Sequence, residues 1–121
     1  MRSLPVIHRH GTTKRYSDST AHQGTVYLVE VPSLEGGDIR AQTSNLLANV
    51  DARLAEAGTD RHHLLLVQVF LTSMDDYEGF NAVWDHWVPE GTAPARACVQ
   101  VSALAKPGWR VEVIVTAAVP A

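Results

Sequence analysis

Hydrophobic side chains recur along the chain with two spacings, of which the longer predicts two helices. Between residues 39 and 57 they recur every three or four positions, as on the buried face of an amphipathic helix. Asp38 offers an N-cap before this segment, and Gly58 offers a stop after it. A second helix is predicted over about 76–88, before Pro89. Its apolar stripe consists of Phe80, Val83, Trp84 and Trp87.

Shorter segments with continuous or alternating apolar residues predict the strands of a sheet. These segments cover residues 24–31, 63–71, 97–101 and 110–119. Residues 12–18 are a candidate partner for the first of them. The order of strands, helix, strand, helix and strands predicts an α+β two-layer sandwich, in which two helices cover one face of a mostly antiparallel sheet. The 121 residues suffice for a single domain, in which residues 1–11 are expected to form a loosely held N-terminal extension.

The segment 63–71 is apolar on both of its alternating faces, which is typical of a strand buried on two sides. Two helices can cover only one face of the sheet, so the other face needs a different cover. A second copy of the chain is the simplest source of that cover. The sequence therefore predicts a homo-oligomer.

Composition and charge narrow the classes of function. The chain is 45% hydrophobic and 19% charged, which is typical of a globular protein and not of a disordered one. Its net charge of −3 and the absence of a basic stripe give no support for a nucleic-acid partner. No apolar run approaches the ~20 residues needed to span a bilayer, and no secretory signal pattern is present. The chain is therefore not expected to bind a membrane. Its single cysteine, Cys98, cannot form an internal disulfide, so the chain is expected to be cytoplasmic.

Charged residues within the two last predicted strands are candidates for chemistry. Because the all-apolar sets of these strands are expected under the helices, alternation places Arg96, Cys98 and Glu112 together on the opposite face. Burying an arginine and a glutamate at an interface is costly unless they are paired or functional. On spacing alone, a structural ion pair between Arg96 and Glu112 is the simpler interpretation. The alternative is a ligand site, in which the guanidinium binds a small carboxylate and Glu112 holds a water.

The sequence contains no motif that is typical of a metal site or a nucleotide site. The histidines at positions 8, 10, 62 and 63 lack zinc-binding spacing, and no glycine-rich phosphate loop is present. We therefore expect no metal and no organic cofactor. Cys98 is expected to be a small buried thiol, because no histidine can be assigned as its base.

Three separated motifs resemble the YjgF/RidA family, and the resemblance covers about residues 12–119. The motifs are 42–50 with Leu54 and Ala57-Gly58, then 94–101, then Val111-Glu112-Val113. Residues 80–88 and 15–18 are most similar to the YoaB-like branch of that family. The resemblance implies a chorismate-mutase-like fold and a homotrimer with ligand sites in the clefts between subunits.

The resemblance also implies a reaction that needs no cofactor. RidA-type members hydrolyse reactive enamines and imines, such as 2-aminoacrylate and 2-iminopropanoate, to 2-oxo acids and ammonia. Matched to the family pattern, Arg96 binds the substrate carboxylate and Glu112 positions the water. Tyr16, Asn81 and Cys98 match further positions of the substrate site.

The segment from Val29 to Pro32 departs from the RidA pattern, because it lacks the Ser-Gly that contributes a hydroxyl to the site. Glu30 stands there instead and would bring a negative charge that competes with a substrate carboxylate or selects a different ligand. The sequence leaves open whether Glu30 faces the cleft or the solvent. One alternative function is therefore a non-catalytic trimer that binds a small carboxylate or protects other proteins. A second is an endoribonuclease, against which the acidic balance argues.

Overall fold

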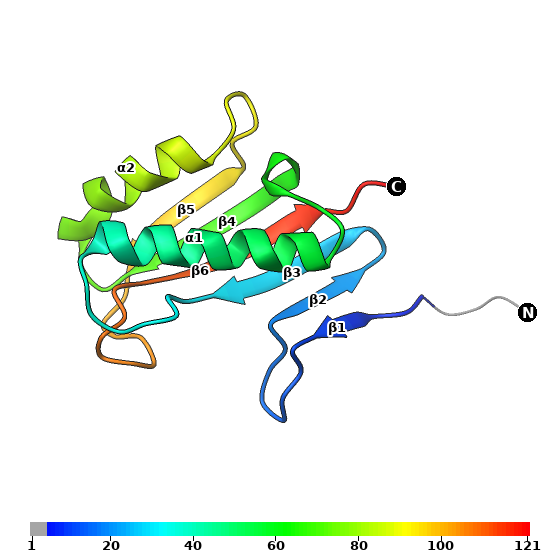
Figure 1. Cartoon of the computed structure of the whole chain (residues 1–121), viewed down its shortest axis with the longest axis horizontal. Coiled ribbons are helices and arrows are strands. Elements are labelled where there is room, and N and C mark those ends of the chain that lie inside the picture. Colours follow the sequence, from blue (N-terminus) through cyan, green and yellow to red (C-terminus); the bar gives the residue numbers. More distant parts are fainter. Residues whose placement is uncertain (1–4) are drawn as a thin grey trace, which may run out of the picture.

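The computed structural model describes residues 5–121 as two helices packed on one face of a six-stranded sheet (Figure 1). The strands are β1 (His8–His10), β2 (Ser19–His22), β3 (Thr25–Glu30), β4 (Leu64–Leu71), β5 (Ala95–Gln100) and β6 (Val111–Ala118). The helices are α1 (Ile39–Glu56) and α2 (Tyr77–Trp87), and the short turns η1 (Arg61–His63) and η2 (Met74–Asp76) precede β4 and α2. The strand order is β1-β2-β3-β6-β4-β5, with only β4 and β5 parallel. The predicted α+β sandwich with a mostly antiparallel mixed sheet is confirmed.

The ends of α1 follow from the two residues that the sequence singles out. The Asp38 carboxylate accepts a hydrogen bond from the backbone N–H of Ala41 at 2.8 Å, which caps the first turn. Gly58 follows the C-cap residue with a φ of +82°, a backbone conformation that glycine adopts without strain. The helix therefore starts and stops where its capping residues lie.

The partner of β3 lies later in the chain than predicted. Residues 12–18 do not pair with β3 but form the loop between β1 and β2. The hairpin between β2 and β3 turns at Gln23 and Gly24, which both have positive φ, at 49° and 81°. A Gln-Gly turn is a weaker sequence signal than Asn-Gly, which is why the short strand before it escaped prediction. Of the expected N-terminal extension, His8–His10 pair with β2, and residues 1–4 lie outside the described residues.

The core lies between the helices and one face of the sheet. The largest fully buried side chains there include Leu46 and Val50 of α1, Phe80 of α2, and Val113 of β6. The opposite face of the sheet, called the open face below, is also apolar. Its exposed large side chains are Tyr27 at 50%, Val29 at 45%, Leu66 at 37% and Val99 at 47%.

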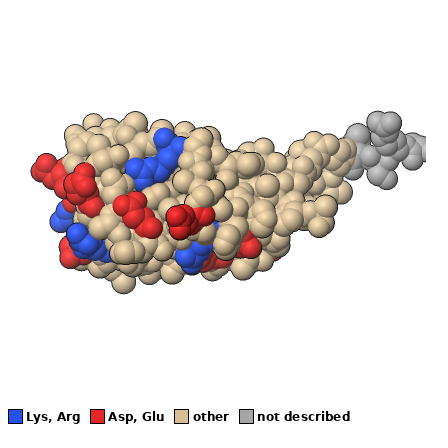
Figure 2. Space-filling view, turned by 90° about the horizontal axis from the view of Figure 1, so that it is seen from above, with Lys and Arg blue, Asp and Glu red and all other residues tan. Residues whose placement is uncertain are grey.

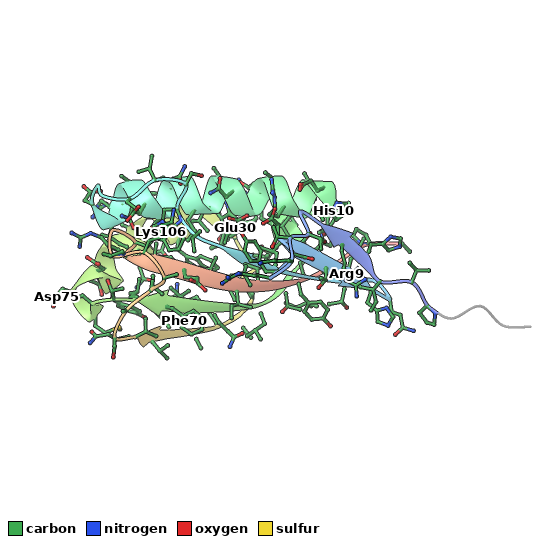
Figure 3. The ribbon with its side chains drawn as sticks, turned by 90° about the horizontal axis from the view of Figure 1, so that it is seen from below. Arg9, His10, Glu30, Phe70, Asp75 and Lys106 are labelled. Atoms are coloured by element: carbon green, nitrogen blue, oxygen red, sulfur yellow. The ribbon has the colours of Figure 1, made fainter. Side chains whose placement is uncertain are left out.

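Strand β4 is therefore apolar on both faces, as the sequence indicates. In Figure 3, Phe70 of β4 lies on the side of the sheet away from α1, whereas Glu30 lies on the side that carries α1. Within residues 5–121, no helix has the length and hydropathy that crossing a bilayer requires.

Candidate functional site

Strand β5 turns the opposite face toward the helices from the one predicted. Arg96 pairs in register with Val67, and Cys98 pairs with Val69, and both valines belong to the buried core. Arg96 and Cys98 therefore lie on the helix-covered face, while Glu112 lies on the open face opposite Phe70. The prediction that Arg96, Cys98 and Glu112 share one face is wrong.

The reason for this inversion lies in α2. Asn81 and Tyr77 give this end of the helix layer polar atoms that accept a guanidinium, so Arg96 can point inward. Ala97 and Val99, which the sequence suggests as core residues, are exposed on the open face of this edge strand.

Arg96 is held by hydrogen bonds and by aromatic rings. Its Nη2 donates to Asn81 Oδ1 at 2.9 Å and lies 3.5 Å from the Tyr77 hydroxyl. The guanidinium carbon lies 5.3 Å from the ring centroid of Trp84, 5.7 Å from that of Phe80 and 5.9 Å from that of Tyr77. Contacts of this kind attract a cation to the ring faces. We call this group of five residues the guanidinium site.

The Arg96 guanidinium is only partly paired. Arg96 Nη1 is buried and has no hydrogen-bond partner. Among residues 5–121, no carboxylate forms an ion pair with Arg96. A fixed guanidinium with an open donor suits a carboxylate supplied by a ligand, which can accept two parallel hydrogen bonds.

Cys98 lies two residues along β5, on the same face, and packs against the core. Burial raises the pKa of the Cys98 thiol, and the nearby Arg96 charge opposes this shift. A thiol with a raised pKa stays protonated and is a weak nucleophile. The residue is half-buried, so the thiol is less enclosed than the sequence predicts.

A second region with candidate site residues is a cavity of about 400 Å³. It is formed by the loop before β2, the end of β3, the loop before β6 and β6 itself. Its lining comprises Tyr16, Ser17, Asp18, Val29, Glu30, Val31, Ala105, Trp109 and Glu112. We call it the acidic cavity. It brings Tyr16 and Glu112 together, as the family pattern implies, and it adds Glu30 and Trp109.

Burial is the main influence on the pKa of the two glutamates of this cavity. It raises the pKa of Glu112, and it also raises the pKa of Glu30. For Glu30 the neighbouring Asp18 and Glu56 add to the rise in pKa, while the Val31 backbone and Arg53 oppose it. Both groups thus hold a proton to a higher pH than a free glutamate does.

Arg53 of α1 is the basic residue that contacts the edge of the acidic cavity. Its guanidinium lies 3.5 Å from Asp18, 4.0 Å from Glu30 and 3.2 Å from Glu56. One positive charge is therefore divided among three carboxylates. The Glu30 side chain, which is 14% exposed, makes no hydrogen bond through its carboxylate to any other side chain of the described residues.

The loops that wall the acidic cavity are tied to α1 by a fully buried glutamine. Gln42 Nε2 donates to the carbonyl oxygens of Gly36 and Gly108, both at 2.8 Å. Its Oε1 accepts from the backbone N–H of Arg110, also at 2.8 Å. This single side chain holds the loop that carries Ala105 and Trp109 against the loop that follows β3.

Two asparagines extend this contact along α1. Asn45 Oδ1 accepts from the Ser33 N–H at 2.5 Å, and Asn49 Nδ2 donates to Val31 O at 3.2 Å and to Ser33 Oγ at 2.9 Å. The positions 42, 45, 49 and 53 have helical spacing, so they form one polar stripe on α1. Sequence reasoning treated this segment as an amphipathic helix and missed the stripe, although the spacing of its polar residues is the signal that could have identified it.

Comparisons with known proteins support the fold and identify relatives of the chain. Residues 6–119 match the family model described as Endoribonuclease L-PSP. The chain is 37% identical over 115 residues to a RutC family protein of Haemophilus ducreyi, covering 94% of this chain and 97% of that protein. It is 38% identical over 105 residues to the RutC family protein YoaB of Escherichia coli, covering 87% and 91%. A crystal structure of a YjgF family member from Neisseria meningitidis superposes with a TM-score of 0.92 at 43% identity, covering 96% and 97%.

Proposed function

Because this chain belongs to the YjgF/RidA family, we propose that it hydrolyses reactive enamine and imine intermediates to 2-oxo acids and ammonia. Substrates of the 2-aminoacrylate and 2-iminopropanoate type carry a carboxylate beside the reacting carbon. The observation that carries the proposal is the half-buried Arg96 side chain, whose buried Nη1 has no hydrogen-bond partner and which has no carboxylate partner among residues 5–121. A substrate carboxylate would complete it.

In this proposal Arg96 anchors and orients the substrate. Asn81 and the aromatic rings fix the guanidinium plane, so the substrate carboxylate is held in one orientation. Orientation supplies much of the required acceleration, because imine hydrolysis is intrinsically fast. Cys98, beside Arg96 with a protonated thiol, serves as a contact to the substrate and takes no covalent part.

Glu112 is proposed to position the water and to move its proton. The water adds to the imine carbon, the carbon–nitrogen double bond becomes single, and the resulting carbinolamine expels ammonia as the carbonyl forms. A carboxyl group whose pKa is raised by burial suits both accepting a proton from the water and returning it to the departing nitrogen. Tyr16, which lines the same cavity, is proposed to contact the substrate through its hydroxyl.

The site is proposed to form between copies of the chain. Arg96 lies on the helix-covered face and Glu112 on the open face, so one chain does not bring them together. A homotrimer, as the family resemblance implies, would cover the apolar open face and bring the guanidinium site of one copy to the acidic cavity of the next.

Two alternatives remain as competing proposals. A non-catalytic trimer that binds a small carboxylate or protects other proteins is favoured by Glu30, which stands in place of the Ser-Gly of RidA and lines the same cavity as Glu112. An endoribonuclease is the weaker alternative. Acidic and basic side chains are interspersed on the face shown in Figure 2, without a continuous basic groove for a phosphate backbone. Only this second alternative predicts RNA binding that weakens steeply with salt.

The deciding experiment measures ammonia and 2-oxo acid release from enzymatically generated imines. A panel of parent amino acids is compared for the wild type and for Arg96→Ala. We expect acceleration by the wild type that disappears in the variant. A folded, oligomeric wild type that accelerates no imine of the panel would overturn the deaminase proposal in favour of ligand binding.

A further inference from the structure

The loop of residues 11–18, between β1 and β2, carries Tyr16 to the acidic cavity. We call it the Tyr16 loop. Within one chain the Tyr16 side chain is 63% exposed, so packing does little to fix it, and its place depends on the loop backbone. The base of the loop is closed by the Asp18 N–H, which donates to the His10 carbonyl oxygen at 2.9 Å.

Hydrogen bonds make the tip of the Tyr16 loop a compact turn. The Thr13 N–H donates to the Tyr16 carbonyl oxygen at 2.7 Å, and the Tyr16 N–H donates to Thr13 Oγ1 at 3.2 Å. Across the loop, Thr12 Oγ1 lies 2.7 Å from Ser17 Oγ. These bonds shape the loop, but they are internal to it and do not hold it against the rest of the fold.

Asp18 supplies the contact between the Tyr16 loop and the helix layer. Its Oδ2 lies 3.5 Å from Nη1 of Arg53 on α1. A Cβ added at Gly11 would overlap this carboxylate, so the carboxylate occupies space that residue 11 leaves free by lacking a side chain. Among residues 5–121, Asp18 is the only residue of the loop whose side chain forms a hydrogen bond or an ion pair outside the loop.

We propose that Asp18 is a positioning residue, whose ion pair with Arg53 fixes the Tyr16 loop on α1 and so holds Tyr16 at the acidic cavity. This inference rests on the proposed deaminase function, because Asp18 acts through the Tyr16 contact and not on the reacting atoms. The Asp18 and Arg53 side chains are partly exposed, at 38% and 28%. We therefore expect the pair to contribute a factor of about three to the reaction, because partly exposed ion pairs are weak.

Backbone order parameters from ¹⁵N relaxation test the positioning itself, whether or not the chain turns over an imine. In Asp18→Asn, which keeps the side-chain shape and removes the charge, the values for the Tyr16 loop should fall from about 0.85 toward 0.6. Glu56→Gln is the matched control, because it removes a charge from the same Arg53 without touching the loop, and it should leave these values unchanged. Unchanged values in Asp18→Asn, or an equal fall in both variants, would overturn the proposal.

Kinetics of a double variant test whether Asp18 acts through Tyr16. In Asp18→Asn alone we expect kcat/KM to fall about threefold. In a Tyr16→Phe background, which lacks the hydroxyl that the loop is proposed to deliver, Asp18→Asn should cause no further loss. An equal loss in both backgrounds would overturn the proposal and leave the deaminase function standing. A wild type that accelerates no imine would overturn the deaminase function and, with it, the assignment of Asp18 to that reaction.

Discussion

The guanidinium site and the acidic cavity bury charge in opposite ways. Around Arg96, one cation lies among aromatic rings and an amide oxygen, with no anion among residues 5–121 to neutralise it. In the acidic cavity, Asp18 and Glu30 share Arg53 at the edge, and Glu112 forms no ion pair among residues 5–121. Each region has the charge that the other lacks, and the sheet separates them within one chain. In the proposed function, each region is one half of a site that two copies complete.

Replacing Arg96 by alanine is expected to give the largest effect, because it removes the only cation of the guanidinium site and with it most of the activity. Removing one partner of a buried charge pair costs about 2–5 kcal/mol. The value of kcat/KM should therefore decrease by a factor that lies between about 30 and several thousand. Steady-state kinetics on a single imine measures the loss. Arg96→Lys sharpens the result, because it keeps the charge and loses the planar fork; nearly full activity in Arg96→Lys would contradict two-pronged carboxylate binding.

Mixing two inactive variants tests whether the halves come from different copies. If each site takes Arg96 from one chain and Glu112 from another, randomly mixed Arg96→Ala and Glu112→Gln chains leave roughly a quarter of the sites intact. Activity should therefore rise from background to about a quarter of the wild-type value after joint refolding. No recovery in a mixture shown to contain mixed oligomers would place both residues of each site in one chain.

Gln42 tests how strongly the polar stripe of α1 supports the acidic cavity. Gln42→Leu removes the Gln42 partner of the Gly36 carbonyl and of the Arg110 N–H, while the Gly108 carbonyl keeps its hydrogen bond from the Gly36 N–H at 3.2 Å. Each group that loses its partner costs about 1–3 kcal/mol, partly relieved by water. We expect the free energy of unfolding to fall by about 2–4 kcal/mol in urea titrations. Thr43→Val is the control, because the Thr43 hydroxyl is buried without a partner, so its loss should be neutral or stabilising.

Glu112→Gln is expected to give the smallest effect, which is a change in how the free energy of unfolding depends on pH. Because burial raises its pKa in the folded state, folding takes up a proton between the ordinary value of 4.5 and the raised value. Stability from this group therefore falls as the pH rises through that window. Glu112→Gln should be more stable than the wild type at pH 7, by about 0.5 kcal/mol or less, and equal to it below pH 4.5. Thermal unfolding at both pH values measures this, and a less stable variant at pH 7 would show that the ionised form is stabilised.

The sequence predicted those features that depend on local pattern. The caps of α1, the buried set of β6 and the two-sided apolar character of β4 were correct because each is encoded within its own segment. The resemblance to the YjgF/RidA family was also confirmed.

The orientation of β5 could not be predicted, because alternation divides a strand into two sets but does not say which set faces the helices. Ala97 and Val99 suit a core as well as an interface, and only the register with β4 decides between them. The surroundings of Glu30 also depend on a tertiary contact, because Arg53, which lies 4.0 Å from its carboxylate, is far away in the chain.

The placement of the tryptophans allows the two regions to be followed separately by intrinsic fluorescence. The chain has three tryptophans, of which Trp84 touches the Arg96 guanidinium and Trp109 lines the acidic cavity. Each half of the proposed site thus contains an intrinsic fluorophore. Single-tryptophan replacements by phenylalanine would assign an emission change to one half, and ligand occupancy could then be followed in the unlabelled protein.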